Sequence, residues 1–84
     1  MKNKILVELI VPEVEESYNV FLPINRKIGN VIILLSKAVS ELTGGVYTVS
    51  NKTNLYDVST VNAYNMDATV FDTTIRNGSK IVLF

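Results

Sequence analysis

The fold is decided by the stretch TVFDTTIRNGSKIVL, which spans residues 69–83. Within it, Thr69 suits the cap of a single helical turn and Asp72 suits the third position, because oxygen-bearing side chains accept hydrogen bonds from the free amides there. Asn77-Gly78 is a turn signal, since both residue types tolerate a left-handed backbone. The apolar run that follows, at residues 80–84, predicts the last strand of the chain.

The N-terminal part of the chain is a predicted hairpin. Residues 5–11 are apolar and rich in β-branched side chains apart from Glu8, which predicts a strand. Because a charge is costly to bury, the face that carries Glu8 should point to solvent. The opposite face, which should line the core, consists of Ile5, Val7, Leu9 and Val11. Residues 12–16 carry three carboxylates and suit a solvated tip, and residues 17–24 provide the second strand.

A helix is predicted after the hairpin, with one apolar stripe at three- and four-residue spacing. The stripe consists of Ile28, Val31, Ile32, Leu35, Ala38, Val39 and Leu42. Asn25 suits the N-cap, and Gly44-Gly45 should end the helix because glycine adopts the left-handed C-cap backbone at low cost. Ile33 and Leu34 overfill the stripe. We interpret them as helix core, with a second binding surface as the alternative.

Shorter segments separate the helix from the last strand. Residues 46–49 predict a short strand, residues 51–54 a turn, and residues 55–58 a further short strand. Residues 59–68 have turn-favouring character and little periodicity. The order of elements predicts an α+β fold in which one helix covers one face of a mixed, four- to five-stranded sheet, since helix and sheet each have a single apolar side.

Two segments resemble ubiquitin-like domains, which have the β-grasp fold. Residues 22–31, LPINRKIGNV, look like the entry to the ubiquitin helix, where an Ile-x-Asn-Val step places two buried aliphatics. Residues 69–83 are similar to the family's Thr-Leu-x-Asp-x-x-Ile segment and final strand. Val70 and Ile75 take the two apolar positions of that segment, and Asp72 takes the acidic one. The β-grasp requires the first and last strands to pair in parallel.

The ending Asp-x-x-Ile-x-Asn-Gly-x-x-Ile/Leu-x-Leu is similar to that of the YukD-like proteins. These are small ubiquitin-like proteins linked to type VII (Esx/Yuk) secretion in Gram-positive bacteria. The resemblance implies a bacterial protein-interaction module that is accessory or regulatory to a secretion system. Ubiquitin acts through a C-terminal diglycine tail, which YukD-like proteins lack. The present sequence finishes at Leu83-Phe84, so we expect no conjugation.

Composition narrows the possible chemistry. The 84 residues, of 9.3 kDa, are expected to form one domain over residues 1–84, since so short a chain cannot build two cores. Eight basic and eight acidic residues give zero net charge, which argues against a nucleic-acid partner. The absence of cysteine and histidine excludes thiolate and imidazole metal ligands and the usual Ser/His or Cys/His nucleophile pairs.

No active site and no membrane segment are predicted. Glu13, Glu15 and Glu16 lie close together, but at a hairpin tip nothing removes them from water, as acid–base catalysis would require. We therefore expect no enzyme, no metal and no cofactor. The apolar runs are far shorter than the roughly 20 residues that span a bilayer, so we expect no membrane insertion and a cytoplasmic location.

Apolar residues are predicted on the sheet face that points away from the helix. If Ile81 and Leu83 face the helix, neighbouring positions face outward. These positions are Leu6, Ile10, Phe21, Val82 and Phe84. We interpret them as a protein-binding surface, because an apolar patch of a few hundred Å² marks an interaction site. The alternatives are exposed residues without a role, a register shifted by one position, or a 59–68 loop folded over the patch.

Two functions are compatible with such a surface. In the first, it docks on a protein partner, by resemblance the cytoplasmic domain of a secretion membrane subunit. In the second, it closes a symmetric homodimer with no secretion role, which zero net charge does not oppose. Tyr47 and Tyr56, on the short strands, either extend the patch or are half-buried strand aromatics.

Overall fold

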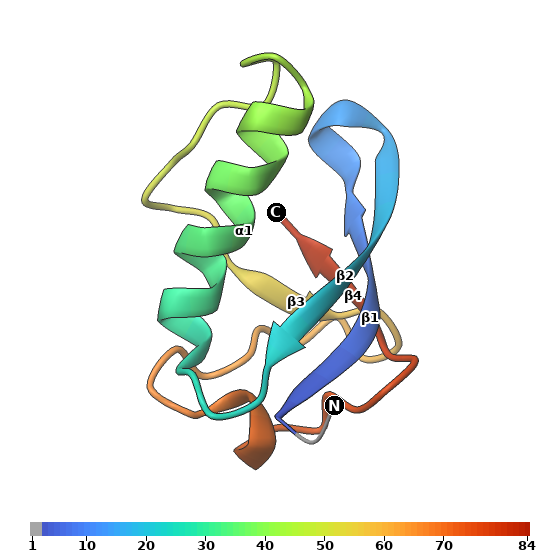
Figure 1. The fold of residues 1–84 in the computed structure, drawn as a ribbon, viewed down its shortest axis with the longest axis vertical. Helices are drawn as coiled ribbons and strands as arrows, with labels where there is room; N and C mark the ends of the chain where they lie inside the picture. Colours follow the sequence, from blue (N-terminus) through green and yellow to red (C-terminus); the bar gives the residue numbers. More distant parts are fainter. Residues whose placement is uncertain (1–2) are drawn as a thin grey trace.

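The computed structural model describes residues 3–84 and shows one helix lying across one face of a sheet (Figure 1). The strands are β1 (Lys4–Val11), β2 (Glu16–Pro23), β3 (Leu55–Asp57) and β4 (Lys80–Leu83). The helix is α1 (Ile28–Leu42), and two short 3-10 helices are η1 (Pro12–Val14) and η2 (Val70–Asp72). In Figure 1 the helix lies on one side and the β1–β2 hairpin on the other, with the C-terminus between them.

The sheet has the connectivity of a ubiquitin-like β-grasp. Within residues 3–84 it contains four strands in the order β2-β1-β4-β3. β1 pairs with β2 antiparallel and with β4 in parallel, and β3 joins β4 antiparallel. The predicted parallel pairing of the first and last strands is confirmed. Both chain ends therefore contribute the two central strands, β1 and β4.

The core lies between α1 and the inner face of the sheet. As expected from Glu8, the inner face of β1 is formed by Val7, Leu9 and Val11, which are fully buried, while Ile5 is partly buried. The other buried hydrophobic residues are Leu22, Ile28, Val31, Ile32, Leu35, Val39, Tyr47, Leu55, Val70, Ile75, Ile81 and Leu83. The predicted register of β1, β2 and β4 is therefore confirmed.

The stretch that decides the fold attaches the last strand to the first. The Gly78 amide, at a φ of 90°, donates to the Leu6 carbonyl at 2.7 Å. The Leu6 amide in turn donates to Asn77 Oδ1 at 2.8 Å. The Asn-Gly turn thus continues the pairing of β1 beyond the start of β4. The predicted helical turn is η2, where Thr69 Oγ1 bonds Asp72 Oδ2 at 3.0 Å rather than a backbone amide.

The N-cap of α1 differs from the prediction. Lys27, not Asn25, is the N-cap residue. The first helical amides are bonded from outside the helix: the Ile28 amide donates to the Ala68 carbonyl at 2.9 Å and the Gly29 amide to the Met66 carbonyl at 3.0 Å. Because the loop before η2 supplies these acceptors, the helix begins without the side-chain cap that the sequence suggested.

The apolar stripe of α1 is narrower than predicted. Ala38 and Leu42 are exposed, and Ser36 is buried in their place. Ile33 and Leu34 are exposed as well, so their interpretation as helix core was wrong. A helix with 3.6 residues per turn can turn only about one third of its surface to a single sheet, so an overfilled stripe leaves some apolar side chains outside.

Residues 46–49 are not among the strands of the described chain, contrary to the prediction. This segment runs back beside α1 before it reaches β3 (Figure 1). Two of its amides donate to side chains: the Tyr47 amide to Thr43 Oγ1 at 3.0 Å, and the Thr48 amide to Glu13 Oε2 at 3.3 Å. Tyr47 is buried in the core and does not extend the predicted patch. Residues 55–57 do form a strand, β3, as predicted.

Candidate protein-docking surface

The five predicted surface residues all lie on the outer face of the sheet. Alternation along β1 places Leu6, Glu8 and Ile10 on this face. The strand register then sets Phe21 opposite Leu6 and Val82 opposite Ile10. Phe84 lies two residues after Val82, directly after the end of β4. The strand register thus brings these residues to one face, as predicted.

The loop of residues 59–68 leaves most of this face open, and Val61 reaches its edge. Phe21 and Phe84 keep 64% and 69% of their surfaces exposed, and Leu6 keeps 39%. Ile10 and Val82 are half-buried because they pack side by side on neighbouring strands. The loop instead turns back against β3 and the start of α1, where the Tyr64 amide donates to the Leu55 carbonyl and the Met66 carbonyl accepts from Gly29.

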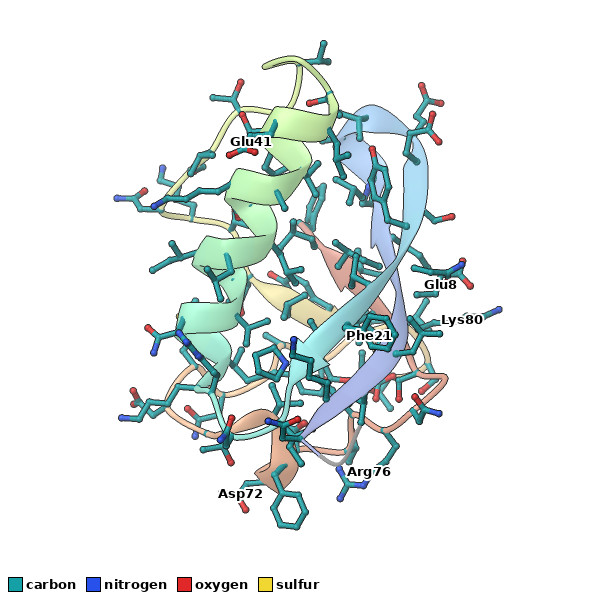
Figure 2. The ribbon with its side chains drawn as sticks, in the orientation of Figure 1. Glu8, Phe21, Glu41, Asp72, Arg76 and Lys80 are labelled. Carbon is teal, nitrogen blue, oxygen red and sulfur yellow. The ribbon has the colours of Figure 1, made fainter. Side chains whose placement is uncertain are left out.

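The apolar face is divided by a charged row. Glu8 pairs in register with Asn19 on one side and with Lys80 on the other. In Figure 2, Phe21, Glu8 and Lys80 all lie on the side of the sheet away from α1. The predicted patch is therefore two apolar clusters with a row of opposite charges between them. We call the first cluster, Leu6 and Phe21, the knob.

The second cluster is hollowed. An open hollow of about 560 Å³ lies over β4 and β3. Its apolar walls are formed by Pro12, Tyr56, Val58, Val61, Val82 and Phe84, and we call this site the hollow. Tyr56 belongs here because it pairs with Val82 in the sheet register. Sequence reasoning missed Pro12, Val58 and Val61, which come from a turn and a loop without periodicity and so give no signal of the face they reach.

The rim of the hollow contains a strained residue. Val61 has a φ of 59° and is 75% exposed. A β-branched residue in this left-handed region is an outlier, at a cost of roughly 1–2 kcal/mol. The loop is held closed by bonds from the Val61 amide to the Asp57 carbonyl, 2.8 Å, and from the Asp57 amide to the Asn62 carbonyl, 3.0 Å. Strain that packing does not explain is typical of functional positions.

The carboxylate of Asp57, beside the hollow, accepts hydrogen bonds from within its own loop. Asp57 accepts hydrogen bonds from the Ser59 hydroxyl at 2.7 Å and the Ser59 amide at 2.8 Å. These bonds hold the pKa of Asp57 below its ordinary value. Nearby, burial raises the pKa of the Tyr64 hydroxyl above its ordinary value. Asp57 thus fixes the loop that carries Val58 and Val61.

Most side chains of this surface are apolar, so the surface is suited to hydrophobic contact. Within residues 3–84, no three Asp or Glu side chains gather as metal ligands would. Glu13, one of the hairpin carboxylates, bonds the Thr48 amide and so has a structural role. In the same part of the chain, no helix combines the length and apolar character needed to cross a membrane.

Comparison with known proteins identifies the fold. No protein-family model and no curated protein matches the sequence. One similar structure is a chain of the MycP5-free ESX-5 inner membrane complex, with a TM-score of 0.80 and 14% sequence identity. The match covers 98% of the present chain but only 21% of the longer chain in that complex. The ubiquitin-like domain of the Mycobacterium tuberculosis type VII secretion system protein ECCD1 matches with a TM-score of 0.75 and 15% sequence identity. This match covers 95% of the present chain and 96% of the ECCD1 domain. A chain of the toluene 4-monooxygenase HD complex matches with a TM-score of 0.74 and 10% sequence identity, over 95% of each chain.

Likenesses at such low identity show the fold alone. The chain has the ubiquitin-like β-grasp fold, and the resemblance to ubiquitin-like domains tied to type VII secretion is confirmed at that level. The same fold in a monooxygenase complex shows that fold does not fix function.

Proposed function

We propose that this chain is a non-enzymatic ubiquitin-like module, accessory or regulatory to a bacterial type VII secretion system, which acts in the cytoplasm by docking and is not itself conjugated. The observation that carries the proposal is the apolar outer face of the sheet, with an exposed knob at one end and a hollow at the other. It stands on a fold shared with ubiquitin-like domains of secretion proteins.

The surface suits a protein partner. Phe21 and Phe84 are large aromatic side chains that stand mostly in water, and such residues dominate binding energy once a partner excludes the solvent. Glu8 and Lys80, which lie between the two phenylalanines, carry opposite charges that can fix the orientation of the partner. Nucleic acid would instead require a basic surface, whereas the net charge of this chain is zero.

We infer that the partner is the cytoplasmic domain of a membrane subunit of the secretion machine. The inference is supported by the matching chain of an inner membrane complex, of which a domain with this fold is a part. A module of the same fold would bind beside such a domain or compete with it.

Capture of the secretion complex tests the proposal. The tagged full chain is immobilised and exposed to detergent-solubilised membranes of its native host, and secretion membrane subunits are quantified by mass spectrometry. The wild type should retain a subunit that the double variant Phe21→Ser/Phe84→Ser loses by at least about tenfold. The control is Phe71→Ser, because Phe71 lies on η2 outside the sheet and is 63% exposed, nearly the same as Phe21.

Thermal unfolding of each variant confirms that the fold is intact, as expected for substitutions of exposed side chains. Equal capture of a secretion subunit by the wild type and the double variant would reject the sheet face as the docking surface. Capture of no secretion subunit by any form would reject the secretion role.

A further inference from the structure

We propose that the outer sheet face also closes on a second copy of this chain, with Phe21 of each copy seated in the hollow of the other. The dimer would then cover the surface that docks on a partner, so that self-association and docking exclude each other. This exclusion rests on the proposed function, whereas the dimer itself does not.

The knob presents an unpartnered aromatic side chain. Phe21 lies on β2, an edge strand of the sheet in residues 3–84, and Leu6 stands opposite it on the same face. At 64% exposure most of the ring is in contact with water. Covering such a ring is favourable, because the gain scales with the apolar area removed from water.

The hollow is the complementary feature. Its volume of about 560 Å³ leaves room for an aromatic side chain, and its walls are apolar. Val61 stands at the rim in its strained left-handed conformation, with three quarters of its surface exposed. This side chain contributes little packing to the single chain, so its exposed methyl groups are available to contact a ring that enters the hollow.

The positions of knob and hollow fit a two-fold axis. Four residues along β1 separate Leu6 from Ile10, and two to three strand spacings separate β2 from the hollow between β4 and β3. With about 3.3 Å per residue and 4.8 Å per strand, the hollow lies roughly 18 Å diagonally from Phe21. A two-fold axis in the plane of the face, halfway along that diagonal, sets each Phe21 over the partner hollow. The two sheets then cross at a steep angle, as in orthogonally packed sheets.

The charges favour this pairing. Glu8 and Lys80 are register neighbours in the row halfway between knob and hollow, which is where the axis passes. Each copy would bring one acid and one base to the axis, so the centre of the interface is neutral and offers reciprocal ion pairs. The whole chain carries eight charges of each sign and does not repel its own copy at long range. One rotation therefore satisfies both apolar features and the charges, as a closed dimer requires.

Sedimentation velocity of the purified full chain, from about 1 µM to 1 mM, tests the dimer. The wild-type mass should rise from 9.3 kDa towards twice that value. Phe21→Ser removes the knob, and Val61→Asp places a charge at the rim of the hollow in a conformation that Asp accepts more readily than Val. Each variant alone should dissociate at least about tenfold more readily. Phe71→Ser, the matched exposed aromatic on η2, should behave as the wild type.

Mixing the two variants distinguishes this arrangement from other dimers. In a mixture of Phe21→Ser and Val61→Asp, Phe21 of the second variant can still enter the intact hollow of the first. The mixture should therefore associate more strongly than either variant alone. A wild type that stays at 9.3 kDa, a Phe21→Ser variant that dimerises unchanged, or a mixture no tighter than its components would overturn the proposal. None of these results depends on a partner, so the dimer can fail while docking stands, and the reverse.

Discussion

At the scale of single residues, Ser36 stands out because its buried hydroxyl lacks a hydrogen bond within residues 3–84. It faces the core from α1, and its Oγ is buried without a hydrogen-bond partner in residues 3–84. A buried hydroxyl that has lost water without gaining a partner destabilises a protein by about 1–3 kcal/mol. The sequence pattern gave no warning, because serine was absent from the apolar stripe.

Replacing Ser36 with alanine should therefore stabilise the protein. Ser36→Ala is expected to raise the free energy of unfolding by about 1 kcal/mol, measured by urea denaturation. Part of that gain is helix propensity, which Ser40→Ala on the same helix reports separately. If the two variants gain equally, the buried hydroxyl carries no penalty of its own.

A second residue-scale prediction concerns acid. The hydrogen bonds from Ser59 lower the pKa of Asp57 in the folded state, so the folded state binds this proton less readily than the unfolded chain. The stabilisation is present above the ordinary pKa of an aspartate and is lost as the pH falls through the folded pKa. Carboxyl NMR titration should show the lowered pKa, and Ser59→Ala should raise it. An Asp57 pKa that is the same in both proteins would contradict this assignment.

At the scale of elements, one amide side chain adds a hydrogen bond to the backbone bonds that join the first and last strands. Asn77 Oδ1 accepts a hydrogen bond from the Leu6 amide, in the place where a backbone carbonyl of a strand would otherwise accept it. Asn77→Ala should cost about 1 kcal/mol of stability, the typical value of one hydrogen bond, and should speed hydrogen exchange at the Leu6 amide. Asn25→Ala is the control, because Asn25 is also exposed and does not cap α1. Equal exchange at Leu6 in both variants would remove the role of Asn77.

The same scale shows what sequence could predict. The two-residue alternation around Glu8 correctly predicted the inner face of β1, and with it the outer positions Leu6 and Ile10. The stripe of α1 was predicted less well, because Ala38 and Leu42 are exposed and Ser36 is buried. Features that depend on a distant segment failed. Carbonyls of Met66 and Ala68 bond the first amides of α1, so Asn25 was not needed as a cap. The hollow was only half predicted for the same reason, since Val58 and Val61 reach it from a loop.

At the scale of the whole molecule, the topology predicts cooperative unfolding. The central strands β1 and β4 come from opposite ends of the sequence, and within residues 3–84 β3 pairs with β4 alone among the strands. Leu9 lies where these parts meet, since it pairs with Tyr18 in β2 and with Ile81 in β4 and is completely buried. We expect a defect there to affect more than one hairpin, because β1 pairs both with β2 and with β4.

Leu9→Ala should accordingly lower the free energy of unfolding by about 2–5 kcal/mol, a large share of the 5–15 kcal/mol of a typical domain. Leu34→Ala, the same change at an exposed position of α1, should cost less than about 1 kcal/mol. Far-UV circular dichroism follows α1, and fluorescence follows the four tyrosines, which lie outside it. Because residues 1–84 are expected to form one domain, both signals should shift together in Leu9→Ala. A helix signal that persists after the tyrosine signal is lost would mean that α1 folds apart from the sheet, and the single-domain expectation would be wrong.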